Sequence, residues 1–173
     1  MTNGKKQKGA RNLDSLLNQY DEQLNRVEKE EKKEKSDRET FTEQFLTLCD
    51  QTIKPVFERL KSKVEKRGHK VQIETREPSW DSRKKVPIEP SISFDVELKR
   101  KSDNDRYYGT RDKPHISFIC NASKRIVSSY ESTIGLGHGG HGGGRGEFNI
   151  EAVTADLVEK NFMDWFDSLI SGR

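Results

Sequence analysis

Apolar and polar side chains alternate without a break in the stretch Ile92-Ser93-Phe94-Asp95-Val96-Glu97-Leu98. Because successive side chains of a strand point to opposite faces of a sheet, this pattern predicts a strand with one buried face and one face in water. Val71 and Ile73 alternate in the same way. Residues 115–121 and 124–134 are expected to form two more strands, joined by a tight turn, and a short strand is expected at 147–150.

Two runs on either side of these strands have helical rather than strand spacing. In each run the apolar residues recur every three or four positions, which predicts a helix with one buried face. Their apolar residues are Phe41, Phe45, Leu48, Cys49, Ile53, Val56, Phe57, Leu60 and Val64 in the first, and Leu157, Val158, Phe162, Trp165, Phe166, Leu169 and Ile170 in the second. Pro55 is expected to kink the first helix and Gly68 to end it, while Thr154 is expected to cap the second.

The order of these elements predicts the fold class. No helix lies between consecutive strands, so the strands cannot be joined by helical crossovers. We therefore expect an α+β fold, with a mainly antiparallel sheet of four or five strands and with the 40–67 helix and the C-terminal helix packed on one face. Three segments are expected to be loops: residues 77–90 with three prolines, the polar residues 102–113 and the glycine-rich residues 135–146.

The chain divides unevenly into a charged part and an apolar part. Of its 173 residues 30% are hydrophobic and 35% are charged, and apolar residues are scarce before Phe41. A segment with so few apolar residues cannot bury enough surface to offset the entropy of ordering the chain. We expect a disordered basic tail at residues 1–11, a charged helical arm at 12–39 and an α+β domain at 40–173.

The arm contains one apolar stripe, which we call the seam. Its residues follow one another at intervals of four, three, four and three, the spacing of a short coiled coil, and Asn12 is placed to cap the helix. The seam consists of Leu13, Leu17, Tyr20, Leu24 and Val27. Beyond it, residues 28–39 are almost all charged, so the seam has no apolar surface nearby to cover it. The leading prediction is a protein-interaction or assembly module that binds a protein partner or itself through the seam, as a homo-oligomer.

Two other functions follow from the basic residues. Nucleic-acid binding would use Lys5, Lys6, Lys8 and Arg11 of the tail together with clusters at strand ends, where aromatic side chains such as Trp80 could stack on bases. These clusters are Arg83, Lys84 and Lys85, then Lys99, Arg100 and Lys101, and then Arg111. A sensor for a small anionic ligand or nucleotide would instead use the backbone amides of the 135–146 loop together with Arg145.

The sequence predicts no catalytic residue, metal or cofactor. Residues 135–140 fit the glycine pattern of a dinucleotide site, but no helix follows there to hold the pyrophosphate. His138 and His141 are too few ligands for a zinc site, and no nucleophile has an evident base beside it. Cys49 and Cys120 are expected to be buried free thiols, which suits a reducing compartment. The chain has no stretch long enough to span a membrane, so we expect a cytoplasmic protein.

Overall fold

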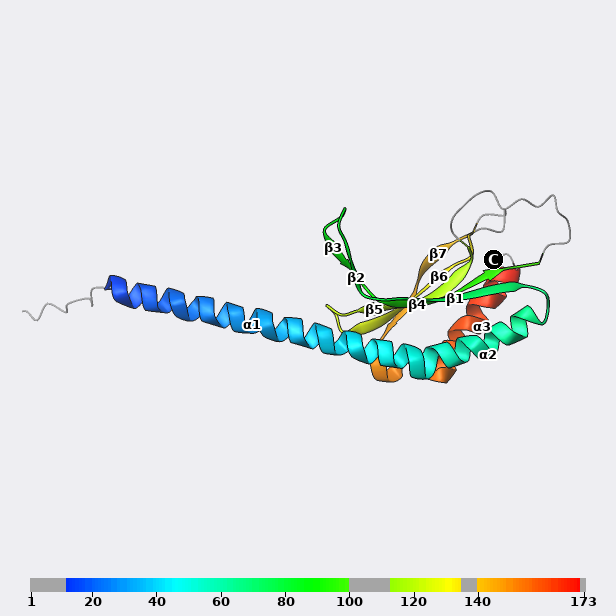
Figure 1. Cartoon of the computed structure of the whole chain (residues 1–173), viewed down its shortest axis with the longest axis horizontal. Helices are drawn as coiled ribbons and strands as arrows, with labels where there is room; N and C mark the ends of the chain where they lie inside the picture. Colours follow the sequence, from blue (N-terminus) through cyan, green and yellow to red (C-terminus); the bar gives the residue numbers. More distant parts are fainter. Residues whose placement is uncertain (1–11, 100–112, 135–139, 172–173) are drawn as a thin grey trace, which may run out of the picture. The chain divides into compact units, whose positions relative to one another are not determined.

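The computed structural model describes residues 12–99, 113–134 and 140–171 and has the α+β fold that the sequence predicts (Figure 1). Its contacts divide the chain into two compact units, Met1–Asp37 and Arg38–Arg173. Helix α1 (Leu13–Leu48) belongs to both units, and its first residue is capped as expected, because the backbone N–H of Asp14 donates to Oδ1 of Asn12 at 3.1 Å.

The helical run of the second unit continues without a break past Leu48. A π-helical turn, η1 (Cys49–Ile53), leads into α2 (Lys54–Glu65). Pro55 is the second residue of α2, and a proline has no N–H to donate to the preceding turn. A single turn with wider hydrogen bonding absorbs that loss, so the predicted interruption takes the form of a π-bulge. Gly68 ends the run with a φ of +84°, a conformation that favours glycine.

Five antiparallel strands form the main sheet. They are β1 (Lys70–Arg76), β4 (Ser91–Glu97), β5 (His115–Asn121), β6 (Ile126–Ser132) and β7 (Gly142–Phe148), in the spatial order β1-β4-β5-β6-β7. Helix α3 (Ala155–Ser171) follows a single turn of 3₁₀-helix, η2 (Ile150–Ala152), and the Oγ1 of Thr154 accepts from the N–H of Leu157 as an N-cap. In Figure 1, α2 and α3 lie on the same side of the sheet.

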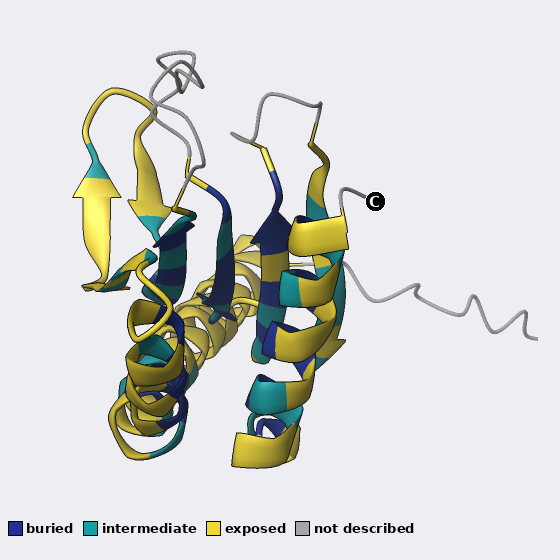
Figure 2. Cartoon of the chain, turned by 90° about the vertical axis from the view of Figure 1, so that its right-hand side faces the viewer, coloured by how far each residue is buried: buried dark blue, intermediate teal, exposed yellow. Residues whose placement is uncertain are grey.

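The core lies between this sheet and the helices, and Figure 2 shows the buried residues on the surfaces that face each other. Phe94 of β4 is at its centre, with its ring 5.4 Å from that of Phe57 on α2 and 4.9 Å from that of Phe162 on α3, both edge to face. Burying a side chain of this size stabilises the fold by about 1.5–3 kcal/mol. Phe94 therefore joins both helices to the same strand.

Three local predictions were wrong. Residues 77–90 are not all loop, because β2 (Ser79–Asp81) and β3 (Val86–Ile88) pair as a separate hairpin. Pro87 is tolerated there because each strand of a two-stranded sheet is an edge. The glycine-rich segment is not all loop either: Gly142–Gly146 belongs to β7, which ends at Phe148 rather than at Ile150. Ile170 is 60% exposed and does not lie on the buried face of α3. Residues 135–139 and 100–112 lie outside the described part of the chain.

Candidate functional site

The seam is the longest row of exposed apolar side chains in the described residues. The exposed fraction is 67% for Leu13, 51% for Leu17 and 57% for Tyr20, and it is 45% for Leu24 and 50% for Val27. Leu16, which the sequence reasoning did not include, is 44% exposed. Monomeric proteins expose such residues singly rather than in contiguous rows, so a row of this kind indicates an interaction surface.

Charges beside the seam are of one sign. If Leu13, Tyr20 and Val27 take the d positions of a heptad, the e positions hold Asp14, Asp21 and Glu28, and the g positions hold Leu16, Gln23 and Glu30. Four of these six flanking residues are acidic and none is basic. In coiled coils the e and g positions select the partner by charge.

Within the described ranges, the predicted basic residues do not form one cluster. Arg83, Lys84 and Lys85 are exposed at the turn of the β2–β3 hairpin, whereas Lys99 follows β4, where its N–H donates to Nδ1 of His69 at 2.9 Å. The basic tail, Arg100, Lys101 and Arg111 lie outside the described residues.

The β2–β3 hairpin holds its basic turn in a defined shape. Oδ1 of Asp81 accepts from the backbone N–H of Arg83 at 2.9 Å and of Lys84 at 3.1 Å, while Lys85 has a φ of +54°. On β2, Trp80 is 61% exposed. The hairpin therefore presents a large aromatic ring and three successive cations together, on a short ribbon.

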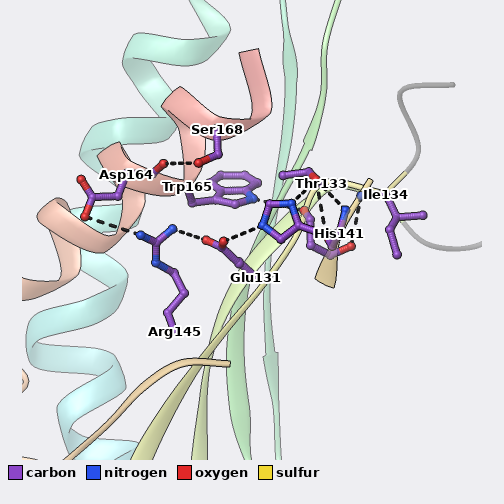
Figure 3. A network of polar contacts seen from close by, with 9 residues as sticks. Glu131, Thr133, Ile134, His141, Arg145, Asp164, Trp165 and Ser168 are labelled. Carbon is purple, nitrogen blue, oxygen red and sulfur yellow. Dashed lines mark hydrogen bonds and ion pairs between the residues drawn. The ribbon is translucent and has the colours of Figure 1, made fainter. Parts of the chain in front are cut away.

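Arg145 lies in an ion-pair network at the buried face of the sheet (Figure 3). It pairs with Glu131, whose side chain is only 8% exposed, and its Nη2 is 3.6 Å from Oδ2 of Asp164 on α3. Gly143 of β7 pairs with Glu131 of β6, so Arg145, two residues further along β7, lies on the same face of the sheet as Glu131. Two carboxylates thus already surround the guanidinium that the sequence reasoning assigned to an anion.

His141 completes the network from the other side of Glu131. Its Nε2 lies 3.1 Å from Oε1 of Glu131, and its backbone N–H donates to Oγ1 of Thr133 at 3.1 Å. Nearby, Nε1 of Trp165 donates to the carbonyl of Ser132 at 3.1 Å. These bonds attach β6 to β7 and α3. His138 lies outside the described residues, and within the described part of the chain no three potential metal ligands of the His, Cys, Asp or Glu type converge.

Both cysteines are buried free thiols, as predicted. Burial raises the pKa of the Cys49 thiol to about 12 and that of the Cys120 thiol to about 11. Because the thiolate is the nucleophilic form, neither side chain is suited to covalent catalysis or to metal binding near neutral pH.

None of the helices in the described ranges combines the length and the apolar character needed to cross a bilayer. Comparisons with known protein families, with curated proteins and with solved structures find no match to this chain.

Proposed function

We propose that this chain is a protein-interaction module that pairs through the seam with an amphipathic helix of a partner protein. The observation that carries the proposal is the exposure of every seam residue, from 45% to 67%, on a helix with coiled-coil spacing. Two amphipathic helices that pair along such a stripe remove both apolar surfaces from water. The seam spans two heptads, about 22 Å of helix, which favours a reversible complex.

The charges that flank the seam favour a basic partner over a second copy. In an antiparallel pair of identical seams the e positions meet each other, so Asp14, Asp21 and Glu28 would oppose their own counterparts. In a parallel pair Gln23 and Leu16 would meet Glu28 and Asp21, without a cation to balance either acid. A partner helix with Lys or Arg beside its apolar stripe removes this repulsion and adds attraction.

The test compares two double variants with the same change in charge. Leu17→Asp/Leu24→Asp places carboxylates in the seam, whereas Asn18→Asp/Asn25→Asp places them beside it, away from the apolar stripe. The probe is a labelled three-heptad peptide with Leu at a and d and Lys at e and g, followed by fluorescence anisotropy. We expect the seam variant to lose affinity at least tenfold and the control to retain it within twofold.

Sedimentation of the same proteins without peptide examines self-association. If the unmodified chain forms a dimer and the seam variant is monomeric, the chain is still an interaction module, but its partner is a second copy of itself. If the seam variant changes neither peptide affinity nor mass in solution, the proposal is wrong.

Binding of a nucleic acid is a second candidate, supported by the β2–β3 hairpin. Trp80 can stack on an unpaired base while Arg83, Lys84 and Lys85 bind phosphates. Replacing these three cations by Gln should weaken binding to a labelled oligothymidylate and reduce its salt dependence, since fewer counterions are released. Replacing Lys63, Lys66 and Arg67 by Gln removes the same charge near the end of α2. Equal losses in the two triple variants, or no binding in dilute salt, would eliminate this candidate.

A further inference from the structure

The face of the sheet opposite the helices is hollowed. A depression of 520 Å³ opens over β1, β4, β5 and β6, with polar side chains along most of its lining. Cavities of about 300–1,000 Å³ are the usual size of sites for small ligands. The sequence predicts that this face is polar, but it does not predict a hollow there.

Small side chains in the middle of the sheet produce the depression. Ser93 of β4 lies opposite Ser117 of β5, and longer side chains continue the same row, with Glu74 beyond Ser93 and Tyr130 beyond Ser117. Ser91 extends the low floor along β4. Ser117 already donates to the carbonyl of Tyr130 at 3.5 Å and Ser93 hydrogen-bonds Asp95, but each hydroxyl oxygen can still accept hydrogen bonds, so the floor suits a ligand with many hydroxyl groups.

One wall of the hollow is aromatic and fixed in place. The ring of His115 stacks on that of Tyr130, with centroids 5.9 Å apart and planes at 27°. Nδ1 of His115 lies 2.8 Å from the carbonyl of Lys113, which holds the imidazole in one orientation. The stack provides a flat surface for the C–H face of a ring, beside groups that hydrogen-bond its edge.

The rim of the hollow has acidic and basic side chains, and its two cations, Lys113 and Arg76, differ in their ion pairing. Nζ of Lys113 lies 4.0 Å from Oε2 of Glu97. Arg76 is exposed at the end of β1, and no ion pair holds it among the described residues. A guanidinium binds phosphate and carboxylate through two parallel hydrogen bonds. Arg76 is therefore the side chain of this hollow that is best placed to bind an anion.

Asp95 lies inside the hollow, opposite His115. Burial raises the pKa of its carboxyl, and Glu74 raises it further, while His115, Ser93 and Lys113 act in the opposite direction. A carboxyl that is more easily protonated repels an incoming anion less, and in its neutral form it can donate as well as accept a hydrogen bond.

We infer that this hollow binds a small polyhydroxylated anion of the sugar phosphate class, with its hydroxyl groups on the serine floor and its phosphate on Arg76. The serines and Asp95 supply donors and acceptors for the hydroxyl groups, and the His115–Tyr130 stack covers one face of the sugar ring. Such a site lies on the second unit and does not depend on the seam.

Calorimetric titration of the full chain tests this inference with three probes: glucose 6-phosphate, glucose and inorganic phosphate. Glucose 6-phosphate should bind at least tenfold more tightly than either of the others, because it alone uses both the floor and Arg76. Arg76→Gln should reduce its affinity at least tenfold. Lys70→Gln is the matched control, because Lys70 lies on β1 outside the hollow, and it should leave the affinity within twofold.

One further variant tests the floor of the hollow. Ser93→Leu raises the floor and should abolish binding, with circular dichroism to verify that the variant is folded. The inference is overturned if glucose 6-phosphate does not bind, if inorganic phosphate binds equally well, or if Arg76→Gln and Lys70→Gln behave alike. Binding that survives Ser93→Leu in a folded protein would also overturn it.

Discussion

Two runs of apolar residues in this chain have the same helical spacing but different surroundings. The seam residues Leu13 to Val27 are 45–67% exposed, whereas in the second unit the residues Phe41, Phe45, Phe57, Leu60 and Val64 are at most 7% exposed. The difference shows that spacing creates an apolar face without determining what covers it. The second run is followed in sequence by strands with a matching apolar face, and the first is followed by charged residues.

Substitution of one apolar residue in each run should give the largest difference in the free energy of unfolding. Phe57→Ala removes a ring that contacts Phe94 and Phe118 at zero exposure, so we expect it to lower the free energy of unfolding by about 3–5 kcal/mol. Leu17→Ala in the seam should change it by less than about 0.5 kcal/mol. Urea unfolding followed by tryptophan fluorescence, in which the buried Trp165 reports on the core, measures both variants, and comparable losses would refute the distinction.

Removal of Arg145 should have the next largest effect, because it leaves the carboxylate of Glu131 buried with less compensation. We expect Arg145→Ala to lower the free energy of unfolding by about 3 kcal/mol. Lys124→Ala breaks a pair with Glu147 in which both side chains are more than half exposed, and it should change stability by less than about 1 kcal/mol. If the two variants have equal stability, the network does not support the fold.

A smaller change is expected at the start of α1. Asn12→Ala removes the oxygen that accepts from the N–H of Asp14 and should destabilise the first turns of the helix by about 1 kcal/mol. Hydrogen exchange should become faster in residues 13–20, while the amides of β5 keep their rates. Slower exchange in β5 or unchanged rates near Asn12 would contradict this assignment.

Substitution of Asp95 should have the smallest effect on stability, and this effect should depend on pH. Because burial raises the pKa of this carboxyl in the folded state, its contribution to stability is fully present below the unfolded value of about 3.9 and is lost as the pH rises through the folded value. Asp95→Asn should therefore unfold at a higher temperature than the unmodified chain at pH 7, with the difference vanishing near pH 3. If Asp95→Asn is less stable than the unmodified chain at pH 7, this prediction is wrong.

The elements that the sequence predicted are those with unbroken periodicity. The alternation at residues 92–98 and the aromatic face of 157–169 both lie where the pattern places them. The β2–β3 hairpin was missed because Pro78, Pro87 and Pro90 indicate a loop, although an edge strand tolerates Pro87. In β7, glycines have no side chains to show alternation, and pairing with β6 establishes the strand instead.

The candidate sites also differ in whether they can be recognised from the local sequence. The seam is visible in sequence because its spacing is local, and so are the cations at Arg83 to Lys85. The hollow depends on the register that sets Ser93 opposite Ser117, and the environment of Arg145 depends on the register that sets Gly143 opposite Glu131. Neither register has a local signal in the sequence, since both arise from pairing between strands.

The central claim is that the residues from Arg38 onward fold by themselves while the seam requires a partner. A chain that begins at Arg38 tests it most directly, through thermal unfolding beside the full chain, each at several protein concentrations. We predict a cooperative transition within about 3 °C of the full chain, and loss of peptide binding through the seam. An unfolded or markedly less stable shortened chain would contradict the account.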